Sequence, residues 1–252
     1  MSCSNAAELE KQIQNELAQK KRRLYSRHSM QHLFRRHAEE MFKHVGRTDS
    51  VLDVGCGMGD LVLLARKYTN NSVLGIDVSD KCIEIARDRI TDTNHNTEVL
   101  LADIQDLHLQ LPKNGTFDRV LMKGVVHHLA SPSLSFRSAF EMLDSEGALV
   151  ILEGNVSSAY RRLMLALADT MGLSHEASQY PHLPPGKIED ILRDAGFKTI
   201  RVGYVSGAFA PFAYAGLGGP GFWKVADRME AVCQLLAPRL FGWWMLIVAS
   251  KC

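Results

Sequence analysis

The sequence predicts an α/β fold in which a doubly wound, mostly parallel sheet is covered by helices on both faces. The first observation is that apolar, strand-like runs alternate with helical segments between about residues 50 and 153. The second is a glycine-rich turn, VLDVGCGMGD, directly after the first of these runs. Repeated strand–helix order is typical of a parallel sheet with right-handed crossovers. The 252 residues are enough for one domain with a small lid.

Composition limits the class of protein. Hydrophobic residues make up 46% of the chain and charged residues 23%, which is ordinary for a globular protein. The formal net charge of +1 gives no global field that would attract nucleic acid. The cysteines are odd in number and show no pattern, so we expect reduced thiols and no metal site: Cys3, Cys56, Cys82, Cys233 and Cys252. With no apolar run that fits a signal peptide or a membrane span, we expect a cytoplasmic location.

The chain divides into an N-terminal helical extension, residues 1–46, and a main domain, residues 47–252. Apolar residues recur at helical spacing in the extension. In the main domain, strands are expected at SVLDV, SVLGID, EVLLADI, FDRVLMKG and ALVILE, with helices between them. Ser79 is expected to cap the helix that follows it. Lid insertions are expected at about 155–186 and 206–224, and the segments TIRVGYV and GWWMLIVAS are expected to be strands.

The glycine turn indicates a particular kind of ligand. Its spacing, Gly55-x-Gly57-x-Gly59, is one residue shorter than the G-x-G-x-x-G pattern of dinucleotide sites. Asp53 and Asp60 flank the turn and would repel a pyrophosphate, but would attract a cation. S-adenosylmethionine fits, because it is a nucleoside that carries a sulfonium and an ammonium and has no phosphate.

Acidic residues follow the next two strands at the positions that such a ligand needs. Asp77 ends the second strand, where a carboxylate accepts hydrogen bonds from both ribose hydroxyls. Asp103 ends the third strand and is placed for the adenine amino group. Cys56 is interpreted as a small turn residue and not as a nucleophile.

Six motifs in order make the chain similar to the class I S-adenosylmethionine-dependent methyltransferases of the small-molecule type. They are VLDVGCGMG, VLGIDVS, LLADI, FDRVLMKGVVHHL, EMLDSEGALVILE and DAGF, over roughly residues 30–205. The resemblance implies a seven-stranded, Rossmann-like sheet with an antiparallel last strand and S-adenosylmethionine as cofactor. It implies these cofactor-binding residues: Asp53, Gly55, Cys56, Gly57, Gly59, Asp77, Val78, Asp103, Ile104 and Lys123.

Candidate catalytic residues follow the fourth and fifth strands. His127 and His128 are adjacent in GVVHHL, so their side chains are expected to diverge. In related methyltransferases the first residue of such a pair faces the acceptor and the second packs into the protein. By that resemblance His127 is the base, a role that histidine suits near neutral pH. Glu153 ends the fifth strand and is expected to orient His127 or to touch the acceptor. A hydrogen-bonded structural pair, with catalysis by positioning alone, is the other interpretation.

The acceptor is expected to lie under the irregular segments. The substrate-contacting residues predicted there are Tyr25, His28, Tyr160, Tyr180 and His182. The loop from 207 to 222 is aromatic and uncharged, which indicates a small apolar or aromatic acceptor, methylated on oxygen or nitrogen, or a lipid tail. Ordinary core beneath a loop explains the same pattern equally well.

Other activities are weighed by their motifs. The Asn/Asp-Pro-Pro-aromatic motif of nucleic-acid amino methyltransferases is replaced by MKGVVHH, and a paired-glutamate loop of arginine methyltransferases is not found. Metal-dependent O-methyltransferases need a carboxylate where Lys123 and the histidines stand. A lipid, protein or RNA acceptor and a non-catalytic cofactor-binding scaffold stay open. The glycine spacing disfavours an NAD-dependent oxidoreductase. No nucleic-acid partner is expected, and nothing in the sequence specifies an oligomeric state.

Overall fold

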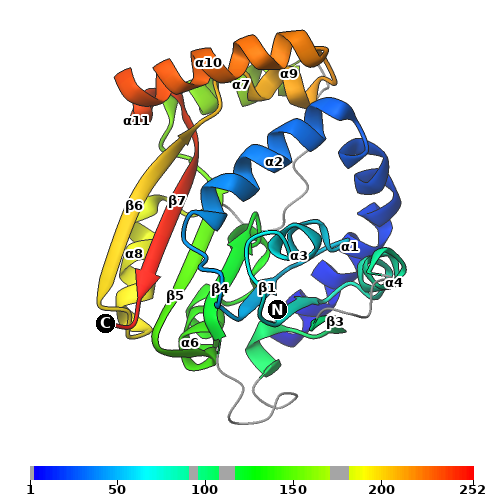
Figure 1. The fold of residues 1–252 in the computed structure, drawn as a ribbon, viewed down its shortest axis with the longest axis vertical. Helices are drawn as coiled ribbons and strands as arrows, with labels where there is room; N and C mark the ends of the chain where they lie inside the picture. Colours follow the sequence, from blue (N-terminus) through cyan, green and yellow to red (C-terminus); the bar gives the residue numbers. More distant parts are fainter. Residues whose placement is uncertain (1–2, 91–95, 108–116, 171–181) are drawn as a thin grey trace.

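A computed structural model describes residues 3–90, 96–107, 117–170 and 182–252. Its sheet has seven strands in the order β3-β2-β1-β4-β5-β7-β6 (Figure 1). The strands are β1 (Val51–Val54), β2 (Val73–Asp77), β3 (Thr97–Leu101), β4 (Phe117–Lys123), β5 (Leu143–Gly154), β6 (Thr199–Ser206) and β7 (Gly242–Ser250). The first five strands pair in parallel, and β7 runs antiparallel to both β5 and β6. The predicted fold class, with its antiparallel last strand, is confirmed.

Helices cover both faces of the sheet. The face with α2 (His28–Phe42), α3 (Asp60–Ala65) and α4 (Asp80–Arg89) forms one apolar core, and the face with α6 (Pro132–Met142) and α8 (Pro185–Asp194) forms the other. Successive residues of β5 alternate between the two cores: Val150 and Leu152 enter the first, and Leu149 and Ile151 the second. This alternation explains why the strand is apolar without interruption. No described helix is both long and apolar enough to cross a membrane.

Local signals in the sequence account for most helix ends. The Ser79 hydroxyl accepts a hydrogen bond from the Cys82 backbone N–H and caps α4, as predicted. Gly196, just beyond α8, has a φ of +111°, which suits glycine at a helix end. The helix α3 ends at Ala65, and the chain then continues in turns in which the Lys67 and Tyr68 backbone N–H groups donate i→i+3 bonds.

The N-terminal extension consists of α1 (Cys3–Tyr25) and α2. The side-chain oxygen of Asn15 on α1 accepts a hydrogen bond of 2.6 Å from the Ser79 hydroxyl, at the start of α4. The extension therefore docks at the carboxyl end of β2. The helices α7 (Ala159–Thr170), α9 (Ala210–Tyr214), α10 (Pro220–Leu236) and α11 (Pro238–Phe241) gather at one end of the molecule (Figure 1). They follow β5 and β6, where the sequence predicts lid insertions.

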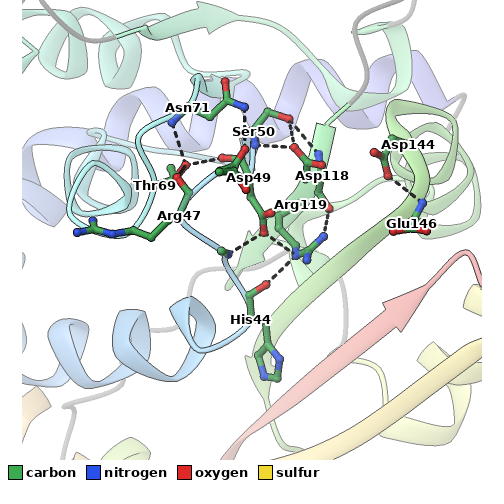
Figure 2. Close-up of polar contacts among 12 residues, drawn as sticks. His44, Arg47, Asp49, Ser50, Thr69, Asn71, Asp118, Arg119, Asp144 and Glu146 are labelled. Carbon is green, nitrogen blue, oxygen red and sulfur yellow. Dashed lines mark hydrogen bonds and ion pairs between the residues drawn. The ribbon is translucent and has the colours of Figure 1, made fainter.

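A polar network fixes the amino ends of β1 and β4 (Figure 2). The Asp118 carboxylate accepts hydrogen bonds of 2.7 Å from both the backbone N–H and the hydroxyl of Ser50. The Arg119 guanidinium lies 3.1 Å from the Asp49 carboxylate and donates to the His44 carbonyl at 2.7 Å. These contacts tie the linker from α2 into β1 to the neighbouring strand, and so set how α2 lies across the sheet.

We predict that Asp118→Ala lowers the free energy of unfolding by about 1–3 kcal/mol, because a carboxylate that accepts two hydrogen bonds is removed. Urea unfolding checks this. Glu146→Ala, an exposed site on the same sheet, is the control and should change stability by less than about 0.5 kcal/mol. Equal stability of the two variants would show that the network does not hold the strands.

Candidate active site

A cavity of about 200 Å³ lies at the carboxyl ends of β1, β2 and β4, beside the glycine turn. Gly55, Gly57 and Gly59 have φ values of +69°, +52° and +78°, a conformation that L side chains rarely adopt. A Cβ on Gly55 would lie 2.3 Å from the Val125 side chain, whereas a Cβ on Gly57 would meet nothing within 4 Å. Gly55 therefore allows close packing of the turn, and Gly57 faces open space where it lines the cavity.

The structure brings most of the predicted cofactor residues to this cavity: Asp53, Gly55, Cys56, Gly57, Asp77, Val78, Asp103, Ile104 and Lys123. Gly59 is the exception, because it directly precedes α3 and faces Ala86 on α4. The Asp77 carboxylate accepts hydrogen bonds of 2.8 Å from the Gly57 and Ser79 backbone N–H groups. Asp77 thus links the glycine turn to the turn that follows β2.

Asp53 gives this cavity a preference for positive charge. Its side chain is buried, and its Oδ2 atom has no hydrogen-bond partner among the described residues. Burial raises the pKa of Asp53 to about 8; the Lys123 ammonium opposes this increase, and Asp77 and Asp60 add to it. A cationic group would supply the missing partner and stabilise the ionised carboxylate. These features fit a ligand with an ammonium or sulfonium group.

A second cavity, of about 530 Å³, adjoins the first. Five residues line both cavities: Tyr25, Phe34, Lys123, Gly124 and His128. The walls of the second are mainly apolar and aromatic, and include Met30, Leu33, Phe34, Leu165, Trp243 and Trp244. Its polar wall contains the predicted catalytic residues His127 and Glu153.

Glu153 is the centre of that polar wall. Its carboxylate is 1% exposed and accepts hydrogen bonds from the backbone N–H groups of Val126, at 3.0 Å, and Gly154, at 2.8 Å. His127 Nδ1 lies 2.7 Å from Oε1, and His182 Nδ1 lies 3.4 Å from the same oxygen. Burial opposes ionisation, but the hydrogen bonds from His127 and His182 outweigh it and hold the pKa of Glu153 well below its usual range.

This arrangement determines the tautomer of His127. An ionised carboxylate only accepts hydrogen bonds, so Nδ1 of His127 must carry the proton. In the neutral ring Nε2 is then the nitrogen that can accept a proton. Glu153, at the end of β5, therefore fixes the orientation of the His127 ring on the short helix η2 (Val126–His128).

The ligand atoms of His127, Glu153 and His182 lie within 4.8 Å of one another and could hold a divalent transition metal ion. The sequence predicts no metal. The distance of 2.7 Å between His127 and Glu153 is that of a charge-assisted hydrogen bond, which needs no ion between the two groups.

The predicted acceptor residues differ in where the structure places them. Tyr25 and His182 line the second cavity. Tyr160 donates a hydrogen bond to the Ala208 carbonyl, and its ring packs against Phe241 and Trp243. His28 is exposed at the start of α2 and is not among the residues that line either cavity. Tyr180 lies outside the described residues.

Sequence reasoning missed several polar residues at the site, and those of the N-terminal extension are the clearest case. Glu10 and Gln14 of α1 line the first cavity, and Glu10 Oε1 lies 2.8 Å from His128 Nδ1. His37 of α2 lines the second cavity, and burial, Lys123 and Arg36 lower its pKa well below the usual value. Each is buried on the inner side of its helix, which the sequence alone does not show. Only the docking of α1 and α2 on the sheet brings these side chains to the cavities.

The comparisons with known proteins agree with this geometry. A family model described as "Methyltransferase domain" matches residues 46–196. A demethylmenaquinone methyltransferase from Symbiobacterium thermophilum is 27% identical over 179 residues, 61% of this chain and 70% of that protein. A probable (S)-tetrahydroprotoberberine N-methyltransferase from Papaver bracteatum is 30% identical over 120 residues, which is 47% of this chain but only 32% of the relative.

Solved structures show the same fold. A SAM-dependent methyltransferase from Archaeoglobus fulgidus has a TM-score of 0.60 at 19% identity, with 87% of this chain and 93% of that chain covered. A possible histamine N-methyltransferase from Thermotoga maritima has a TM-score of 0.63 at 17% identity, with 96% of this chain and all of that chain, 100%, covered.

We predict that Asp53 makes stability depend on pH. Its pKa is about 8 in the fold, against an ordinary value of 3.8, so the folded protein binds more protons between these values. The free energy of unfolding therefore falls as the pH rises from 3.8 to 8, by about 1.4 kcal/mol per pH unit at most. Below pH 3.8 Asp53 is protonated in both states and this loss is absent. Urea unfolding of the ligand-free parent protein and of Asp53→Asn, each measured across this pH range, separates the effect of Asp53 from that of other groups. Parallel pH profiles of the two proteins would contradict it.

Proposed function

Because the chain belongs to the family of S-adenosylmethionine-dependent class I methyltransferases, we propose that it methylates an oxygen or nitrogen atom of a small, apolar or aromatic acceptor. The observation that carries this proposal is the His127–Glu153 pair on the wall of a large apolar cavity that adjoins the glycine turn. A scaffold that only binds the cofactor would not need a buried carboxylate that orients an imidazole.

The cofactor is assigned to the first cavity. Asp77 and Asp103 would hold its nucleoside, and Asp53 would face its cationic part. When bound, S-adenosylmethionine supplies a methyl group that is electrophilic because it is attached to a sulfonium. The five residues that line both cavities would bring the acceptor close to that methyl group, so that positioning contributes to the rate.

The second cavity is assigned to the acceptor. Its apolar walls exclude water and would pack against an apolar or aromatic body. His127 Nε2 would receive the proton as the acceptor's O–H or N–H bond breaks, and the electron pair left on the acceptor would take up the methyl group while the sulfur of the cofactor keeps the electrons of the broken C–S bond. Glu153 stabilises the imidazolium that results and holds the ring in place.

A quinone or other lipid is a second candidate acceptor. It is favoured by the similarity to a demethylmenaquinone methyltransferase and by the volume of the apolar cavity, about 530 Å³. A screen of phenols, amines, quinols and lipids with methyl-labelled S-adenosylmethionine, read by mass spectrometry, tests both candidates. Labelled phenol or amine products support the first. Labelled quinol or lipid products support the second.

We predict that Gly57→Val reduces affinity for S-adenosylhomocysteine by at least about a hundredfold, because the new side chain would project into the first cavity. Isothermal calorimetry measures this. Gly216→Val is the matched control: Gly216 also has a positive φ, +74°, but is not among the residues that line either cavity. Normal binding by a folded Gly57→Val variant would place the cofactor elsewhere.

We predict that His127→Ala reduces single-turnover methyl transfer by about a hundredfold or more, the usual scale for a positioned base. Affinity for S-adenosylhomocysteine should barely change. His128→Ala should instead lower the melting temperature, because it leaves the buried Glu10 carboxylate without its imidazole. Near-normal transfer by His127→Ala would show that positioning alone suffices.

A further inference from the structure

Large apolar side chains that are exposed gather at one end of the molecule. Among the described residues there are fourteen of them, and ten belong to the segment from 163 to 240. We call these ten the cap face: Leu163, Leu167, Phe212, Leu217, Val225, Met229, Val232, Leu235, Leu236 and Leu240. They come from α7, α9, α10, α11 and the loop after α9, which lie together in Figure 1. Exposed apolar residues normally occur scattered, so this concentration marks an interaction surface.

The outer side of α10 is a continuous apolar stripe. Val225, Met229, Val232 and Leu236 are spaced by four, three and four residues, so they share one side of the helix. They are 57%, 50%, 54% and 76% exposed. The opposite side packs into the protein through Trp223 and Ala226. The helix is therefore apolar on its outer side as well as on its inner side, whereas a normal surface helix shows polar residues to the outside.

The acidic side chains of α10 are paired within the protein and its basic side chains are exposed, which favours an anionic partner. Its two acidic residues are engaged by the protein: Asp227 pairs with His32 and Arg36, and the buried Glu230 accepts from the Phe209 backbone N–H. Its two basic residues, Lys224 and Arg228, are exposed. A helix that shows apolar and basic side chains to the outside is typical of a peripheral membrane-binding segment.

The cap face is continuous with the acceptor cavity. Leu167, Phe212 and Leu217 are 47%, 41% and 55% exposed and also line the second cavity. Bound to a bilayer through this face, the protein would have the rim of its acceptor cavity at the lipid surface.

We propose that the cap face docks on an anionic phospholipid bilayer and that the acceptor enters its cavity from the lipid phase. The entry of the acceptor rests on the proposed function, whereas the docking does not. A symmetric dimer through the same face would place two copies of Lys224 and Arg228 in one interface, because a two-fold interface repeats one patch on both subunits. Like charges there would repel, whereas anionic headgroups neutralise them.

Vesicle co-sedimentation of the full chain tests the docking. We expect binding to vesicles of phosphatidylcholine with phosphatidylglycerol, weaker binding to phosphatidylcholine alone, and loss of binding at high salt. Val232→Glu should reduce binding at least about tenfold, because a charge replaces an apolar contact. Lys224→Glu with Arg228→Glu should reduce it by a similar factor through the lost headgroup attraction.

The matched control is Leu134→Glu, since Leu134 is 52% exposed on α6, which lies at the opposite end of the molecule from the cap face (Figure 1). It should bind vesicles like the parent, and all variants should keep their affinity for S-adenosylhomocysteine. No binding to anionic vesicles, or equal binding by Val232→Glu and Leu134→Glu, would overturn the proposal. So would a dimer that Val232→Glu dissociates, which would make a second copy the occupant. Because no readout needs an acceptor, failure of docking and failure of the proposed function are distinguishable.

Discussion

The site depends on one buried carboxylate. Glu153 is ionised although its side chain is only 1% exposed. A buried charge is stable only if hydrogen bonds from the protein replace those that water would make. The Val126 and Gly154 backbone N–H groups and the His127 ring provide them. These bonds fasten the short helix after β4 to the end of β5. The position of η2, the orientation of His127 and the shape of the wall between the two cavities follow from the same set of contacts.

Two adjacent histidines thereby gain different environments. His127 turns to Glu153 and lines the apolar cavity, whereas His128 reaches back to Glu10 on α1 and lines both cavities. The N-terminal helix is thus part of the site and not only an extension of the fold. Because Asn15 also bonds to Ser79 at the start of α4, α1 is held near the carboxyl ends of β2 and β4, two of the strands beside the first cavity.

Short-range sequence signals predict much of the fold and part of the candidate site. Asp77 and Asp103 could be placed because parallel strands end at one edge of the sheet, and Ser79 because helix caps are short-range. Gly59 was expected at the cofactor, but it directly precedes α3 and faces Ala86 on α4, and it is not among the residues that line the first cavity. The roles of Glu10 and His37 could not be predicted, since they arise only when α1 and α2 dock on the sheet.

The most direct test of this account is the tautomer of His127, read from the ¹⁵N chemical shifts of its ring. If Glu153 holds the ring as described, the neutral imidazole carries its proton on Nδ1, and Nε2 has the shift of an unprotonated nitrogen. Glu153→Gln should weaken this preference, because an amide also donates hydrogen bonds. A neutral His127 protonated on Nε2 in the parent protein would contradict the account, because that ring could not accept the acceptor's proton at Nε2.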